Sequence, residues 1–167
     1  FSTVGCVAIV SALAVVDSRI TGSGRVVIRD VIVSVAPILY VTGVKWLVER
    51  PRPITSVGSG LLPGDPSFPS GHTAAAVIVS VMMILIVRNF ARSRFPDGED
   101  DERANRRRVF LRRAIIGAVA LVVAVACSRL LLGLHYPTDV IISATICPLI
   151  SYAVWCVWNA CESAEEW

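Results

Sequence analysis

The stretch SFPSGHTAA, residues 67–75, places a serine, a glycine and a histidine directly before a long apolar run. The apolar residues that follow, up to position 87, are typical of a membrane-crossing helix. Ser70 is of a type that often caps the first turn of a helix, where free backbone N–H groups attract anions. We therefore predict that a transmembrane helix begins here and that its N-terminus belongs to an anion site.

The whole chain has the composition of a polytopic membrane protein. Of its 167 residues 54% are hydrophobic and the mean hydropathy is +0.67, which is too apolar for an ordinary soluble domain. Polar loops separate five apolar segments, at residues 1–16, 26–48, 72–87, 114–132 and 140–158. We predict an all-α, polytopic transmembrane helical bundle that forms a single domain over residues 1–167, without an internal repeat.

The segment 88–113 concentrates most of the charge. It holds nine arginines against five acidic residues, and we predict a hydrophilic, mobile loop there. Because arginine-rich loops are retained in the cytoplasm, the loops 49–69 and 133–139 are expected together on the extracytoplasmic face of the cell membrane. Two interpretations of the basic loop stay open: a solvated connection, and a binding surface for anionic lipids.

Several ionisable residues lie at the ends of the apolar segments that face this outer side. Such groups are costly at membrane depth, so they indicate function. Lys45, Arg52 and Arg129 offer three cations that can bind phosphate oxygens. Ser70 can cap the third apolar helix and bind an oxygen, while Gly71 lets the backbone approach an anion closely.

Two histidines suggest a division of chemical labour. His135 precedes Asp139 by four residues, and Pro137 between them suits the first turn of a helix. That spacing lets the carboxylate fix the tautomer of the His135 ring and stabilise its cation, so that the other ring nitrogen can attack phosphorus. His72 would then protonate the departing alkoxide and later accept a proton from water.

Nothing in the sequence indicates a metal ion or a cofactor. The five cysteines form no CxxC pair and no metal-ligand spacing with histidine; they are Cys6, Cys127, Cys147, Cys156 and Cys161. The acidic residues of the outer loops, Glu49, Asp65 and Asp139, are scattered along the chain. We therefore expect chemistry that needs neither a metal ion nor a cofactor.

Taken singly, these features are weak evidence, because a histidine at a helix start is most often a cap and an Arg-Pro pair is usually part of a loop. Their order on one predicted face is more specific. K-x6-RP (Lys45, Arg52, Pro53), PSGH (69–72) and SR-x5-H-x3-D (128–139) resemble the three-part signature of the type 2 phosphatidic acid phosphatase (PAP2) superfamily. All eleven specified positions agree, and the resemblance covers nearly the whole chain.

The resemblance implies an integral membrane phosphatase that forms a phosphohistidine on His135 without a metal ion, with His72 as acid and base. It also implies that the phosphate is bound by Lys45, Arg52, Ser70, Gly71 and Arg129, with Ser128 in or beside the pocket. Bacterial membrane members of the family usually have six spans, and the opening FSTVG resembles the start of their second span. We therefore expect that one span precedes this sequence; a five-span variant is the alternative.

The expected substrate is a lipid phosphate, and we expect no nucleic-acid partner. Candidates are phosphatidic acid, phosphatidylglycerol phosphate and a polyprenyl phosphate or pyrophosphate, with the headgroup selected by residues 54–66 and by grooves between spans. Two other classes of protein stay open. A vanadate-dependent haloperoxidase would share the anion pocket, although those known are soluble. An anion transporter could place cations at membrane depth, but it does not need two histidines and an aspartate around them.

Overall fold

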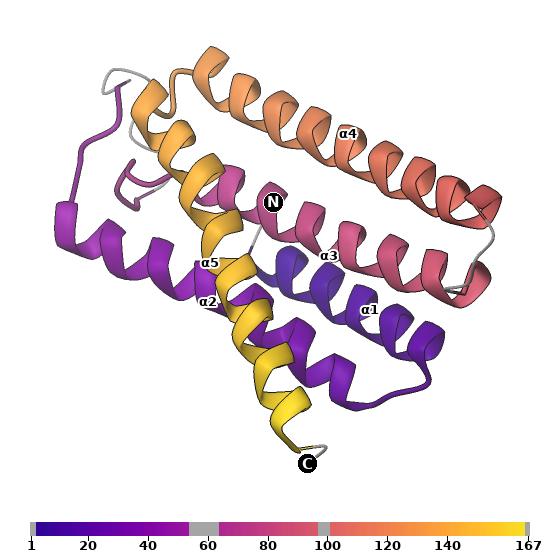
Figure 1. The fold of residues 1–167 in the computed structure, drawn as a ribbon. Coiled ribbons are helices and arrows are strands. Elements are labelled where there is room, and N and C mark those ends of the chain that lie inside the picture. Colours follow the sequence, from indigo (N-terminus) through magenta and orange to yellow (C-terminus); the bar gives the residue numbers. More distant parts are fainter. Residues whose placement is uncertain (1–2, 54–63, 97–100, 166–167) are drawn as a thin grey trace.

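The computed structural model describes residues 3–53, 64–96 and 101–165, and these residues form a helical bundle (Figure 1). The helices are α1 (Thr3–Thr21), α2 (Arg25–Val48), α3 (Gly71–Arg94), α4 (Asp101–Leu131) and α5 (Pro137–Glu165). Four of them, α2 to α5, are long and apolar enough to cross a membrane. The predicted all-α transmembrane bundle is confirmed, although within the described residues four of the five predicted spans meet this criterion.

α3 is the central helix and contacts each of the other four. On its buried face, Val77 packs with Val41 of α2 and Cys147 of α5, and Ile78 packs against Val10 of α1. Small and medium-sized side chains at these contacts let the helices approach one another closely. Close packing is what holds helices together in a membrane, because the surrounding lipid tails are as apolar as the side chains.

The outer surface of the bundle is apolar. Leu39, Ile116, Leu149 and Val157, from three different helices, are each more than half exposed. Within the described part of α4 no side chain is buried, although this helix packs along α3. Such a surface is matched to acyl chains rather than to water.

The basic segment 88–113 is mostly helical, so the prediction of a loop there is wrong. α3 continues to Arg94 and α4 begins at Asp101. Asp101 and Glu102 lie in the first turn of α4, where acidic side chains interact favourably with the helix dipole. Arg106 pairs with Glu102 one turn away at 2.6 Å. The 31 residues of α4 extend over about 46 Å, more than a ~30 Å hydrocarbon core requires.

A buried ionic cluster that the sequence analysis did not single out joins α1, α2 and α3. Arg29 donates hydrogen bonds to Asp17 and Asp30, each at 2.7 Å, and Asn89 donates to Asp17 at 2.9 Å. All three charged side chains of the cluster are buried. Because buried charges need partners, the cluster fixes these three helices relative to one another at the arginine-rich end of α3.

The ends of four helices lie together at the other end of the bundle. α2 and α4 end there, and α3 and α5 begin there (Figure 1). The segments that connect these helices therefore meet, as the sequence analysis predicted from the alternation of apolar segments. They carry the candidate site.

Candidate active site

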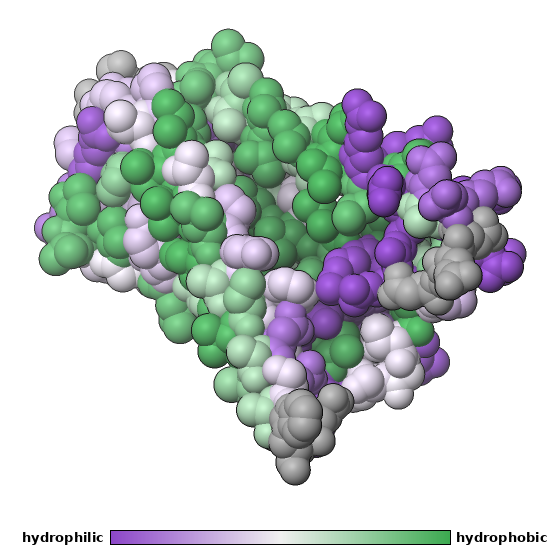
Figure 2. Space-filling view, viewed as in Figure 1, coloured by the Kyte–Doolittle hydropathy of each residue, from purple (hydrophilic) through white to green (hydrophobic). Residues whose placement is uncertain are grey.

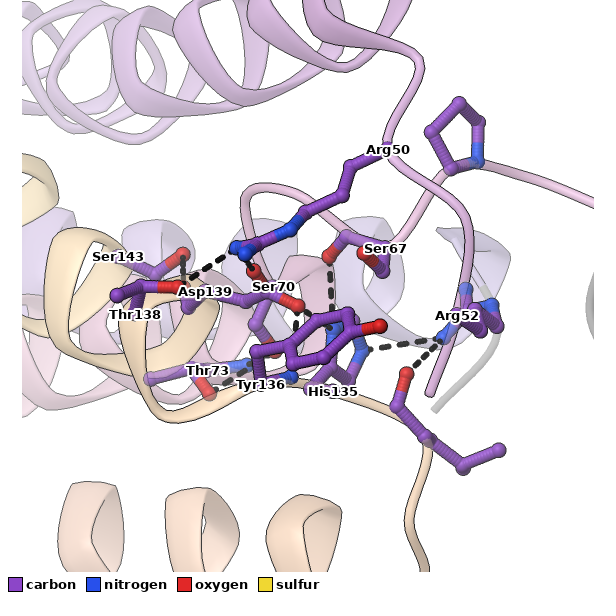
Figure 3. A network of polar contacts seen from close by, with 12 residues as sticks. Arg50, Arg52, Ser67, Ser70, Thr73, His135, Tyr136, Thr138, Asp139 and Ser143 are labelled. Carbon is purple, nitrogen blue, oxygen red and sulfur yellow. Dashed lines mark hydrogen bonds and ion pairs between the residues drawn. The ribbon is translucent and has the colours of Figure 1, made fainter. Parts of the chain in front are cut away.

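Two segments that are distant in the sequence are tied together at this end of the bundle (Figure 3). In the segment that follows α2 in the sequence, the N–H of Ser67 donates to the carbonyl of Arg50 at 2.8 Å. The Ser67 hydroxyl donates to the carbonyl of Pro51 at 3.1 Å. The Arg50 guanidinium then reaches α5 and donates to Asp139 at 2.9 Å. The loop after α2 is thus folded onto itself and bonded to the start of α5.

A glycine turn at the end of α4 brings His135 into the site. Gly133 has a φ of 63°, in the left-handed region that favours glycine. The N–H of Gly133 donates to the carbonyl of Leu130 at 2.9 Å, and the N–H of Leu134 donates to that of Arg129 at 3.2 Å. These two bonds form a Schellman motif, which ends the helix and reverses the chain direction just before His135.

The His135 ring is buried and held on both sides, with an exposed fraction of only 4%. Its Nδ1 lies 2.8 Å from the carbonyl oxygen of Ser67 and 3.4 Å from Oδ2 of Asp139. Since a carbonyl can only accept, Nδ1 carries the proton and Nε2 keeps its lone pair. Nε2 lies 3.3 Å from the Arg52 guanidinium. The spacing of His135 and Asp139 predicts that Asp139 orients the ring, but the Ser67 carbonyl is the closer partner.

Asp139 is a fully buried carboxylate that connects three elements. Its Oδ2 accepts from the N–H of Tyr136 at 2.9 Å, and its Oδ1 accepts from Arg50. Its backbone carbonyl accepts from the N–H of Ser70 at 3.1 Å, just before α3. Arg50 also lies over the Tyr136 ring, 4.2 Å from the centroid. Asp139 therefore supports the His135 turn and the start of α3 together.

The surroundings of His135 favour its neutral form. Burial is the largest influence and lowers the pKa of the ring, and the nearby charge of Arg52 lowers it further. The Ser67 carbonyl and Asp139 act in the opposite direction without reversing the result. With its pKa below the ordinary value, the ring is neutral at neutral pH, and Nε2 is protonated only under more acidic conditions.

Two of the predicted phosphate-binding cations share one carboxylate. Lys45 lies 2.6 Å from Oδ2 of Asp65, and Arg52 lies 2.7 Å from Oδ1. Burial by itself raises the pKa of Asp65, but hydrogen bonds and charges from Lys45 and Arg52 outweigh it and hold the pKa below its usual value. The ionised carboxylate places one oxygen on each cation, an arrangement that two oxygens of a phosphate could also adopt.

The start of α3 has the predicted cap. Ser70 is the N-cap residue, and its hydroxyl oxygen accepts from the N–H of Thr73 at 3.4 Å and from the Thr73 hydroxyl at 3.0 Å. A Cβ atom added to Gly71 would lie 3.8 Å from Cε of Lys45, so Gly71 faces that cation. This is an ordinary contact, and a close approach of the backbone to its described neighbours does not require glycine here.

His72 and Arg129 complete the predicted set. His72 makes no hydrogen bond to a residue that the structure describes, and its basic neighbours include Arg129, His135 and Arg52. Arg129 donates to the hydroxyl of Ser128 at 2.9 Å and, within the described part of the chain, pairs with no carboxylate. All nine residues predicted for the site lie at the same end of the bundle, although His72 is joined to none of the other eight by a hydrogen bond within the described residues.

The chemistry available here is that of cations and imidazoles. In residues 3–53, 64–96 and 101–165, no group of three or more histidine, cysteine or acidic side chains is arranged to hold a metal ion. Asp65 and Asp139 are each engaged by basic side chains. The arrangement suits an oxyanion that is bound by guanidinium and ammonium groups beside a nucleophilic ring nitrogen.

A family model for the PAP2 superfamily matches residues 25–162. The chain belongs to this superfamily. Its fold is similar to the crystal structure of a transmembrane PAP2 type phosphatidylglycerolphosphate phosphatase from Bacillus subtilis, with a TM-score of 0.70 and 19% identity over 95% of this chain and 71% of that one. At this identity the similarity shows the fold alone. No curated protein matches the chain.

Four groups at the candidate site of this PAP2 protein are not among the site residues predicted from the sequence. Arg50 had a signal, since the pair Arg50-Pro51 stands directly before the recognised Arg-Pro pair. Asp65 was noted only as a scattered acid, and its bridging position depends on the folded loop. The Ser67 carbonyl is a backbone group that no side-chain pattern reveals. Gly133 had the ordinary signal of a glycine after an apolar helix.

We predict that Gly133→Ala lowers thermal stability, because a side chain in the left-handed region costs roughly 1–2 kcal/mol. For a chain of this size, each kcal/mol corresponds to about 2–4 °C in Tm. The measurement is the Tm of the purified protein in detergent. Gly117→Ala is the matched control, since a Cβ there meets nothing within 4 Å in α4 and alanine favours the helix. Equal Tm values for the two variants would contradict the role assigned to Gly133.

Proposed function

We propose that this protein is a membrane lipid phosphatase that needs no metal ion and cleaves a phosphomonoester or a pyrophosphate through a phosphohistidine on His135. The observation that supports this most directly is the 2.8 Å contact between Nδ1 of His135 and the Ser67 carbonyl. It assigns the proton to Nδ1 and leaves the Nε2 lone pair beside Arg52. Membership of the PAP2 superfamily supports phosphatase chemistry.

In the first step the substrate phosphate is bound by Lys45, Arg52 and Arg129, together with N–H groups at the start of α3. Nε2 of His135 attacks phosphorus, so a nitrogen–phosphorus bond forms while the bond to the leaving oxygen breaks. Protonated His72 gives its proton to that oxygen. The His135 ring becomes cationic, and Asp139 stabilises it.

In the second step the phosphohistidine is hydrolysed. Neutral His72 takes a proton from a water molecule, and the water oxygen attacks phosphorus. The nitrogen–phosphorus bond breaks and its electron pair returns to Nε2 of His135. Inorganic phosphate leaves, and His72 is protonated for the next cycle. Arg50 and Asp139 act through His135 and are therefore positioning residues.

The substrate is proposed as a lipid phosphate or pyrophosphate. Phosphatidic acid, phosphatidylglycerol phosphate and polyprenyl phosphates are the candidates, and the fold relative named above is a phosphatidylglycerolphosphate phosphatase. The segment 54–66 was predicted to select the headgroup, but residues 54–63 lie outside the described residues. Phosphate release from a panel of these lipids by purified protein would identify the preferred substrate. It would also separate a phosphatase from a haloperoxidase-like enzyme and from an anion transporter.

The roles of the two histidines predict different responses to substitution. His135→Ala should abolish turnover, and the unmodified protein should yield an acid-labile, base-stable phosphoenzyme from labelled substrate. His72→Ala should slow hydrolysis of an alkyl phosphate much more than that of an activated aryl phosphate, because a good leaving group needs less protonation. Rates for both substrates, with and without EDTA, are the measurement.

Three outcomes would contradict this mechanism. Activity of His135→Ala above a few per cent would exclude His135 as the nucleophile. Equal losses on both substrates in His72→Ala would assign His72 to phosphate binding. Loss of activity in EDTA, restored by Mg²⁺, would indicate metal-dependent chemistry.

Asp65 is expected to compete with the substrate phosphate for Lys45 and Arg52. Asp65→Asn removes the negative charge that both cations contact, so inorganic phosphate and vanadate should inhibit at concentrations roughly threefold to tenfold lower. The side chain is 46% exposed, which limits the gain. The measurement is the inhibition constant of each anion at fixed pH and ionic strength.

Glu49→Gln is the control for this prediction, because it removes one exposed negative charge at the same end of the bundle. It should change the inhibition constants little. Weaker inhibition of Asp65→Asn would show instead that Asp65 holds the two cations in their binding geometry.

We further propose that the site faces the outside of the cell membrane, because arginines cluster at the opposite ends of α3 and α4 and such clusters are retained in the cytoplasm. Gly64→Cys and Ser93→Cys, made in a variant without the five native cysteines, test this in intact cells. Both positions are exposed, one beside the site and one at the far end of α3. A membrane-impermeant maleimide should label position 64 and spare position 93; the reverse pattern would place the site in the cytoplasm.

A further inference from the structure

An apolar groove runs between α3, α4 and α5 on the side of the bundle where α4 and α5 diverge. Its volume is about 280 Å³, and its lining includes Leu85 of α3, Ile115 of α4 and Pro148 of α5. Figure 2 shows the apolar surface between α5 and α4, with hydrophilic side chains gathered at the end where α3 and α4 are joined. The groove therefore opens to the membrane and ends beside a basic region.

The groove is separate from the candidate active site. Arg88, the polar residue that lines it from α3, follows Gly71 by seventeen residues, which is about 25 Å along the helix. The two sites therefore lie toward opposite membrane surfaces. A lipid headgroup at Arg88 would belong to the leaflet that does not face His135.

Arg88 brings a positive charge to the groove. Its guanidinium lies over the Trp155 ring, 4.8 Å from the centroid, and it pairs with no carboxylate in the part of the chain that the structure describes. The charged groups with the largest influence on it are Arg92, Arg29, Arg107 and the Asp17 carboxylate. Asp17 is already bound by Arg29 and Asn89.

A second, independent feature of the groove calls for an acceptor. The indole N–H of Trp155 is buried and has no hydrogen-bond partner among the described residues. Buried donors are normally satisfied, and an unpartnered one is costly. Tyr152, one turn before Trp155, also lines the groove. Tryptophan and tyrosine are typical of the depth at which lipid headgroups and ester groups lie.

We propose that this groove binds an anionic phospholipid from the leaflet opposite the active site, with an acyl chain along Leu85, Ile115 and Pro148 and its phosphate on Arg88. Guanidinium groups bind phosphate oxygens through paired, charge-assisted hydrogen bonds. A zwitterionic lipid fits less well, because its ammonium group would lie near Arg88 and Arg92. The proposal does not depend on the phosphatase activity, and such a lipid would connect three helices at the end of the bundle away from the site.

Fluorescence quenching of Trp155 by brominated lipids tests the proposal. Trp46, Trp158 and Trp167 are replaced by phenylalanine, and the full chain is reconstituted in phosphatidylcholine vesicles that contain increasing amounts of brominated phosphatidylglycerol or brominated phosphatidylcholine. The ratio of the two quenching curves gives the relative binding constant. We expect roughly fivefold preference for phosphatidylglycerol, the effect of one arginine near a membrane surface.

Two variants assign the preference to the groove. Arg88→Gln should reduce it to about one, while quenching by brominated phosphatidylcholine stays unchanged and shows that the groove is intact. Arg108→Gln removes the same charge from an exposed position of α4 that does not line the groove, and it should keep the preference. Equal quenching by both lipids, or equal losses in both variants, would overturn the proposal. Absence of quenching by either lipid would also overturn it, because a protein segment or a second copy would then fill the groove.

Discussion

The hydrogen bond between Nδ1 of His135 and the Ser67 carbonyl is the contact on which the candidate site depends. It joins the loop after α2 to the turn before α5, which are separated by 68 residues in the sequence. It also determines which ring nitrogen is free. If this carbonyl were displaced, the ring could adopt the other tautomer and the lone pair would turn away from Arg52. One backbone group thus controls both the geometry of the site and its chemistry.

Other contacts of the site keep that backbone group in place. Ser67 is bonded through its N–H to Arg50 and through its hydroxyl to Pro51. Arg50 is in turn fixed by Asp139, whose carbonyl accepts the N–H of Ser70 at the start of α3. Loops usually carry unsatisfied backbone groups to solvent. Here the described backbone groups bond to one another and to helix ends, although much of the site lies outside helices.

The sequence was sufficient for the fold class and for bringing most residues of the candidate site to one end of the bundle, because both depend on strong local signals. Apolar segments long enough for a bilayer predict helices, and ionisable side chains at their ends are too costly to be accidental. The failures have other causes. The segment 88–113 was read as a loop because it is polar, yet its arginines and alanines are good helix formers and its acids suit a helix start. The positions of Asp65 and of the Ser67 carbonyl depend on how the loop folds back, which a linear pattern does not contain.

The two ends of the bundle balance positive charge differently, and this difference bears on both proposals. At the site, Asp65 lies between Lys45 and Arg52, and Asp139 pairs with Arg50. When a phosphate enters, it can replace the Asp65 carboxylate on the two cations, so neither cation is left unpaired in a region of low dielectric. At the far end Arg88 pairs with no carboxylate of the residues that the structure describes. The charge there is best balanced from the membrane itself, and anionic headgroups are the one abundant source of negative charge at that depth. The Asp65 carboxylate therefore suits an active site that exchanges one anion for another on Lys45 and Arg52. Arg88, which pairs with no described carboxylate, suits a groove that retains its lipid.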